Sequence, residues 1–193
     1  MNVVDRIKGI LLAPRTEWPA IAAEPATVQS IYTGWVMLLA AIGPVMVLLS
    51  SMMFSVLGAG FGLRAGIGMY VMHLISVAVI ALVADLVAPS FGGTKDYVRS
   101  LKLIAYSFTA VWVAELTLIV PLLGGLIVLL AGIYAFYLFF LGAPLLGRCS
   151  NDKAVPYTIV VVLGTIVLMF LIRAIFFSAL YAPLGGGAFG LVR

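Results

Sequence analysis

The chain has 193 residues, of which 64% are hydrophobic and 9% are charged. Soluble domains carry about 25% charged residues, so this composition excludes a typical water-soluble protein. A mean hydropathy of +1.24 leads to the same conclusion. The formal net charge is +4. Anionic lipid headgroups are a sufficient partner for this charge, and we expect no nucleic-acid binding.

The first thirty residues are too polar to cross a membrane. Apolar residues recur there with helical spacing, at Val3, Val4, Ile7, Ile10 and Leu11. We expect residues 1–30 to form an amphipathic lead in the cytoplasmic headgroup region. Pro14 ends its first helix, Thr16 caps a second one, and Trp18 is the ring expected at the membrane interface. One hypothesis is a lead that only anchors the first span, and the other is a regulated partner-binding segment.

Five long apolar stretches follow this lead. About 20 apolar residues cross the roughly 30 Å of hydrocarbon, and continuous rather than alternating runs favour helices over a barrel. The predicted spans cover residues 31–57, 67–88, 103–120, 122–146 and 156–182. We therefore predict an all-α, polytopic membrane bundle of five transmembrane helices, with residues 31–193 as one domain. The glycines from Gly58 to Gly68 predict a flexible turn on the outer side.

The distribution of positive charge predicts the orientation. Eight of the eleven Lys and Arg residues lie on one predicted side: Arg6, Lys8, Arg15, Lys95, Arg99, Lys102, Arg148 and Lys153. The opposite side holds Arg64 and Arg193, and Arg173 lies within the last span. Because cytoplasmic loops are enriched in Lys and Arg, we expect a cytoplasmic N-terminus and a periplasmic or extracellular C-terminus.

The region that joins the second and third spans carries four candidate residues for a cytoplasmic rim: Asp85, Lys95, Arg99 and Lys102. Asp85 lies near the membrane boundary, so we expect it to form an ion pair with Arg99 or Lys102. Phe91-Gly92-Gly93 predicts a turn between the spans. The alternative for this tripeptide is a docking loop beside the three basic residues.

Ionisable residues inside the spans are costly in hydrocarbon and are the default candidates for function. His73, Glu115 and Arg173 come from three spans, and a rise of about 1.5 Å per residue places them at a similar depth. One hypothesis is a structural ion pair between Glu115 and Arg173, with His73 hydrogen-bonding nearby. The other is a hydrated cavity in which His73 or Glu115 takes up a proton and Arg173 holds an anion.

Four methionines and the single histidine flank the predicted outer turn, at Met52, Met53, Met69, Met72 and His73. Thioethers suit Cu(I). Methionine is also ordinary filling for apolar cores, so we predict no metal site and no cofactor. Cys149 is the single cysteine, so it forms no intramolecular disulfide, and we assign it no catalytic role.

Familiar catalytic motifs do not occur in the sequence. A single histidine excludes the H-E-x-x-H zinc motif, and there is no G-x-S-x-G elbow. The carboxylates of Asp85 and Glu115 fall on different predicted helices at different depths, which does not suit a pair that shares one proton. We therefore do not expect an enzyme.

Short motifs along nearly the whole chain resemble one known family. They are Leu12, Pro14, Trp18, Ile21 and Glu24 in the lead; Phe91-Gly92-Gly93, Arg99, Leu101, Tyr106 and Ser107 in the middle; and Tyr134, Tyr137, Leu138, Gly142, Pro144 and Asp152-Lys153-Ala154 before the last span. With this order of features the chain resembles the bacterial branch of the Yip domain family, five-pass membrane proteins related to the Ypt/Rab-interacting proteins of eukaryotes. The resemblance implies a cytoplasmic N-terminus and a place in the bacterial inner membrane. It does not imply a Rab partner, because the sequence lacks the longer polar N-terminal region and the Asp-Leu-Tyr-Gly-Pro stretch of the eukaryotic relatives.

We expect a non-enzymatic integral membrane protein that organises the membrane, or recruits a membrane or cytoplasmic protein, through its basic cytoplasmic face. The alternative is a small-solute, proton or metal transporter or channel that uses His73, Glu115 and Arg173. A dry and fully paired polar layer favours the first hypothesis, and an outward-facing hydrated pocket favours the second. Small residues on the spans also leave a homo-oligomer open.

Overall fold

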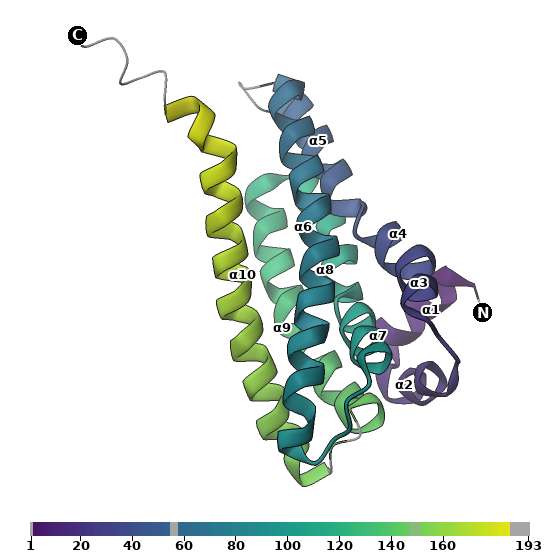
Figure 1. The fold of residues 1–193 in the computed structure, drawn as a ribbon. Coiled ribbons are helices and arrows are strands. Elements are labelled where there is room, and N and C mark those ends of the chain that lie inside the picture. The colour runs from purple at the N-terminus through teal and green to yellow at the C-terminus, as the bar shows by residue number, and fades with distance from the viewer. Residues whose placement is uncertain (1, 55–57, 148, 150, 186–193) are drawn as a thin grey trace.

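The computed structural model describes residues 2–54, 58–147, 149 and 151–185. Every regular element in this part of the chain is a helix, and Figure 1 shows the helices gathered into one bundle. Five of the described helical segments are long and apolar enough to cross a membrane: Val28–Phe54, Gly60–Phe91, Tyr97–Ile119, Leu122–Leu146 and Ala154–Ile172. The all-α fold class and the five predicted spans are therefore confirmed.

The first span is a broken helix. Its elements are α3 (Val28–Ile31), the π-helix η1 (Tyr32–Val36), α4 (Met37–Leu39) and α5 (Ile42–Phe54). The break between α4 and α5 lies just before Pro44, which has no N–H to donate and whose ring clashes with the carbonyl four residues earlier. That carbonyl belongs to Ala40 and is left free for another donor.

The second span is α6 (Gly58–Val87), and it contains the glycines that we expected to form a flexible outer turn. That expectation is wrong, because these glycines lie in a continuous helix, and two of them serve close packing between α5 and α6. A Cβ at Gly62 would overlap the Ser51 hydroxyl, and a Cβ at Gly66 would lie 3.0 Å from Pro44 O. Small residues of this kind allow two membrane helices to approach each other closely.

The 3-10 helix η2 (Ala88–Phe91) ends the second span. Gly92 follows it with a φ of 79°, a left-handed conformation that favours glycine. Phe91-Gly92-Gly93 therefore forms the predicted turn. The third span then consists of α7 (Tyr97–Ser107), α8 (Thr109–Ala114) and the 3-10 helix η3 (Glu115–Ile119).

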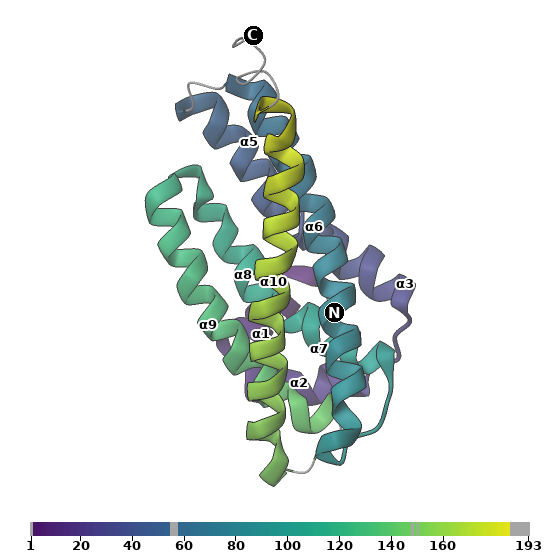
Figure 2. The same ribbon diagram turned by 60° about the vertical axis from the view of Figure 1, so that its left-hand side comes forward.

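The last two spans are α9 (Pro121–Leu146) and α10 (Ala154–Gly185), with the 3-10 helix η4 (Asn151–Lys153) before α10. Figures 1 and 2 show that the connection from η3 to α9 stops short of the far ends of α5, α6 and α10. Glu115 is the first residue of η3, at the end of the third span that lies away from the α6–α7 connection.

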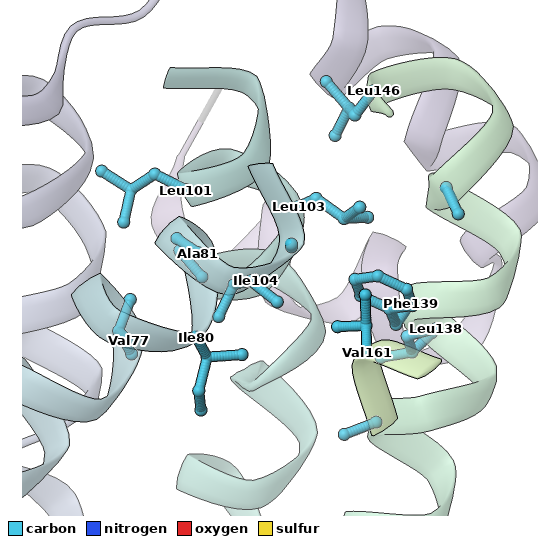
Figure 3. Close-up of a cluster of buried hydrophobic side chains, with 14 of the residues drawn as sticks. Val77, Ile80, Ala81, Leu101, Leu103, Ile104, Leu138, Phe139, Leu146 and Val161 are labelled. Atoms are coloured by element: carbon cyan, nitrogen blue, oxygen red, sulfur yellow. The ribbon is translucent and has the colours of Figure 1, made fainter. Parts of the chain in front are cut away.

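A hydrophobic core joins α6, α7, α9 and α10 in the middle of the bundle (Figure 3). Its buried side chains include Val77, Ile80, Ala81, Leu101, Leu103, Ile104, Leu138, Phe139, Leu146 and Val161. Lipid tails are as apolar as these side chains, so van der Waals packing, rather than the removal of apolar surface from water, stabilises this core.

The lead consists of α1 (Val3–Leu12) and α2 (Pro14–Ala23), which pack against α8 and α9. Trp18 is 1% exposed, and its ring atoms lie 2.8 Å from a Cβ built on Gly142 of α9. Trp18 is thus a core residue, because the glycine leaves room for it, and its position at the membrane interface stays a prediction. The expected cap at Thr16 is wrong: α2 begins at Pro14, and the Thr16 hydroxyl donates to Ala13 O at 2.9 Å.

Candidate functional site

The candidate site is a buried polar contact that joins three spans. Pro44 leaves the Ala40 carbonyl without its helical donor, and His73 of α6 takes that place, with Nδ1 3.2 Å from Ala40 O. A carbonyl oxygen only accepts hydrogen bonds, so Nδ1 carries the proton in this contact. The kink in the first span therefore fixes the orientation of the imidazole ring.

The second ring nitrogen faces a carboxylate. His73 Nε2 lies 3.3 Å from Glu115 Oε1. An imidazole with a proton on Nδ1 can share a further proton with this carboxylate through Nε2. Sharing a proton in this way would lower the cost of burying the two groups among apolar helices.

Glu115 is only 2% exposed and lies where α8 changes to η3. Gly43, in the first turn of α5, permits the close approach, because a Cβ there would overlap Glu115 Oε2. Among the described residues, Oε2 has no hydrogen-bond partner. One buried carboxylate oxygen therefore keeps unused hydrogen-bonding capacity.

A cavity of about 480 Å³ adjoins this pair. Met69, Met72 and Ser76 of α6 line it together with His73 and Glu115, and the rest of its lining is apolar. Pockets for small ligands typically have volumes of about 300–1,000 Å³. The site can thus offer a shared proton and hydrogen bonds to a small group that enters from the apolar side.

The structure places the other predicted layer and metal residues differently. Arg173 lies on α10, but its side chain is outside the described part of the structure, so its pairing with Glu115 stays a prediction. Met52 and Met53 are 62% and 63% exposed, whereas Met69 and Met72 line the cavity. The candidate thioethers are therefore not gathered at one place. The described residues contain no group of three or more His, Cys, Asp or Glu side chains that could hold a metal.

Sequence reasoning missed Ala40, Gly43 and Pro44, which position the pair. A usable signal was present, because a proline inside an apolar run releases the carbonyl four residues before it and requires another donor at that depth. Polar side chains on neighbouring spans are the natural sources of such a donor. His73 was recognised as a candidate, but its carbonyl partner was not.

Asp85 does not form the predicted ion pair with Arg99 or Lys102. Asp85 Oδ1 instead accepts hydrogen bonds from Asp96 N at 2.6 Å and Ser100 Oγ at 3.5 Å. Asp96 caps α7 by accepting from Arg99 N at 3.2 Å, and it also pairs with Arg99 Nε at 3.1 Å. The Asp85 carboxylate thus binds the backbone amide of Asp96, and this hydrogen bond fixes the start of α7.

Lys102 is buried and 5% exposed, rather than displayed as a docking residue. Its Nζ donates to Ile21 O at 2.6 Å and to Glu24 O at 2.5 Å, at the end of α2 where carbonyls have no helical donors. Arg6 fastens α1 to the same region, through Glu17 at 2.7 Å and through Glu24. Two buried cations therefore hold the lead in place.

Another set of basic residues remains exposed: Lys8, Arg15, Lys95 and Lys153. Two of them lie on connections between spans that meet in space, because Lys153 Nζ is 4.0 Å from a Cβ built on Gly92. The connections that bear Lys95 and Lys153 therefore lie side by side at this end of the bundle, at the bottom of Figure 1.

Cys149 is buried in the connection between α9 and α10, and its thiol donates to Ala143 O at 3.5 Å. Burial raises the pKa of the Cys149 thiol above its ordinary value. The thiolate, which is the reactive form, is consequently scarce at neutral pH. This environment suits a packed side chain rather than a nucleophile.

The five spanning segments around a buried His–Glu pair define a multi-pass α-helical membrane protein. The family model of the Yip1 domain matches residues 8–186. The chain therefore belongs to the Yip1 domain family, as the short motifs indicated. Comparisons with curated proteins and with solved structures found no match.

Proposed function

We propose that this Yip1-domain protein is a non-enzymatic membrane protein that organises anionic lipids, or recruits a protein partner, at its basic face. We place that face in the bacterial cytoplasm and the C-terminus in the periplasm or outside the cell, because cytoplasmic loops concentrate Lys and Arg. In this proposal His73 and Glu115 hold the helices together, and the basic face makes the contacts with partners.

The observation that supports this proposal is the division of the basic residues into two sets. Arg6 and Lys102 are buried and hold the lead against the bundle. On the predicted basic side, the exposed set consists of Lys8, Arg15, Lys95 and Lys153. Each Lys or Arg near an anionic membrane surface contributes about 1 kcal/mol of attraction. A fixed lead keeps its share of these charges at a defined position relative to the loops.

The test begins with the full-length protein extracted together with its surrounding native lipid and weighed by native mass spectrometry. We expect anionic lipids, or an added mass of protein size, to be retained beyond the average composition of the membrane. Replacing the four exposed cations with Gln should abolish this retention, whereas the buried Arg6 and Lys102 continue to hold the fold. Retention that is unchanged in this variant would contradict the proposal.

Arg64→Gln provides the matched control. Arg64 is exposed, but it lies near the opposite end of α6 from the α6–α7 connection. Its removal changes the net charge in the same direction without touching the proposed face. Loss of retention in this control as well would show a general effect of net charge, and the proposed face would be rejected.

Transport of protons or a small solute is a second candidate, favoured by the cavity of about 480 Å³ beside His73 and Glu115. Glu115→Gln keeps the shape of the side chain and removes the acid. If the protein moves protons, vesicles that contain the wild-type protein should show a flux that the folded variant lacks. Equal fluxes for wild type, variant and empty vesicles would reject transport.

A further inference from the structure

An apolar groove lies between the third span, α9 and α10. Its volume is about 510 Å³, and its lining is apolar apart from Ser107 and Thr165. Phe170 of α10, 73% exposed, and Ile133 of α9, 62% exposed, show that the groove borders the lipid-facing surface. A lipid-like chain can therefore enter it sideways from the hydrocarbon.

The groove continues toward the polar pair. Four residues line both the groove and the cavity beside His73 and Glu115: Phe108, Val111, Val128 and Met169. An apolar track thus begins at the lipid-facing surface and ends at hydrogen-bonding groups. An amphiphile has the same order of properties, with an apolar tail and a polar head.

Two buried polar atoms along this track, Glu115 Oε2 and Ser107 Oγ, have no hydrogen-bond partner among the described residues. Ser107 Oγ is buried and, among the described residues, has no hydrogen-bond partner, and its neighbour in sequence, Phe108, lines both cavities. Ser76 is 3% exposed and lines the inner cavity. Thr165 differs, because its hydroxyl donates to Val161 O within α10. An unsatisfied buried polar group costs about 1–3 kcal/mol, which a hydrogen-bonding head would offset.

We propose that the groove and the inner cavity together bind a single-chain amphiphile with an uncharged hydroxyl head, of the long-chain alcohol or monoacylglycerol class. The tail lies between α9 and α10, and the head lies toward Ser76 and the His73–Glu115 pair. A hydroxyl head suits this end because it can donate a hydrogen bond to the unpartnered Glu115 Oε2 and because a hydroxyl costs far less to desolvate than a charged phosphate. This inference is independent of the proposed role of the basic rim.

The binding test uses the full-length protein in phosphatidylcholine nanodiscs and a monoacylglycerol that carries a photoreactive diazirine in its tail. We expect saturable labelling, mapped by peptide mass to α9 and α10, that excess unlabelled monoacylglycerol prevents and an alkane of equal length does not. Unsaturable labelling over all lipid-facing helices would show ordinary surrounding lipid. Labelling that the alkane prevents as well as the monoacylglycerol does would show that no polar head is recognised. Either result overturns the proposal.

Three glycine variants make the location testable. A Cβ at Gly132, at Gly125 or at Gly60 would meet nothing within 4 Å, so leucine can be introduced at each position. Gly132 lines the groove and Gly125 lines the inner cavity, whereas Gly60 is exposed and lines neither. Gly132→Leu and Gly125→Leu should each weaken saturable labelling about tenfold or more, the equivalent of about 1.4 kcal/mol. Gly60→Leu should leave it unchanged, and equal labelling of all three variants would overturn the assignment.

Discussion

The contact between His73 and Glu115 depends on two uncharged residues of the first span. Pro44 releases the Ala40 carbonyl that orients the imidazole, and Gly43 leaves room for the second carboxylate oxygen. An unsatisfied backbone group in hydrocarbon costs several kcal/mol. Pro44 therefore breaks the helix and leaves the Ala40 carbonyl in need of a donor, which His73 supplies.

Gly43→Ala should destabilise the protein, because the added Cβ overlaps Glu115 Oε2 and displaces the carboxylate from His73. Overpacking of this kind costs about 1–3 kcal/mol, and a lower apparent Tm in detergent will report it. Gly132→Ala is the matched control, since its Cβ meets nothing within 4 Å and alanine favours the helix by about 1 kcal/mol. A Gly43→Ala variant as stable as the control would contradict the packing argument.

The Cys149 thiol should react slowly with iodoacetamide in the folded protein at neutral pH. Burial raises its pKa, so the thiolate fraction stays small and grows only at higher pH than for an ordinary cysteine. A mass-spectrometric time course at several pH values measures this. Ser90→Cys supplies the comparison, because Ser90 is exposed in η2, and two cysteines that react at the same rate would disprove the effect of burial.

Sequence reasoning found the ionisable members of the site but not their contacts. Depth along the spans placed His73 and Glu115 near each other, because a helix has a constant rise per residue. The contacts depend on which side chains are buried, and hydropathy does not measure the burial of a single side chain. Lys102, for example, is buried and donates to the carbonyls of Ile21 and Glu24. Asp85 likewise binds a backbone amide that charge counting does not consider.

Among the elements, the lead differs most from expectation, since α1 and α2 are bound to the bundle by buried charges. Lys102→Met should free the carbonyls at the end of α2 and cost about 1–3 kcal/mol. Hydrogen exchange should then become faster in α2, whereas α9 retains its protection. Lys8→Met, at an exposed position, should leave exchange in both helices unchanged, and a slow-exchanging α2 in the Lys102 variant would contradict the clamp.

The existence and number of the spans followed from hydropathy, but three starting points did not. The first three spans begin at Val28, Gly60 and Tyr97, whereas the sequence analysis predicted starts at residues 31, 67 and 103. Polar residues such as Gln29, Arg64 and Arg99 lie on these helices and interrupt the apolar runs. Glycine was misjudged for a related reason, because close helix packing and a flexible turn select the same residue.

For the whole molecule, the charge distribution and the fold agree on which connections share one end. The α6–α7 and α9–α10 connections meet where Lys153 approaches Gly92, and sequence had placed both on the basic side. The fold alone leaves open which compartment this end faces, since a bundle can be inserted in either direction. From the excess of Lys and Arg we propose that this end faces the cytoplasm.

The orientation can be checked with single cysteines in a Cys149→Ala background. Ser90→Cys lies at the basic end and Arg64→Cys lies near the other end of α6, and both positions are exposed. A membrane-impermeant maleimide added to intact cells should label only Arg64→Cys, and Ser90→Cys should become reactive after the membrane is opened. Labelling of Ser90→Cys in intact cells would invert the assignment, and equal labelling of both would mean that the chain has no fixed orientation.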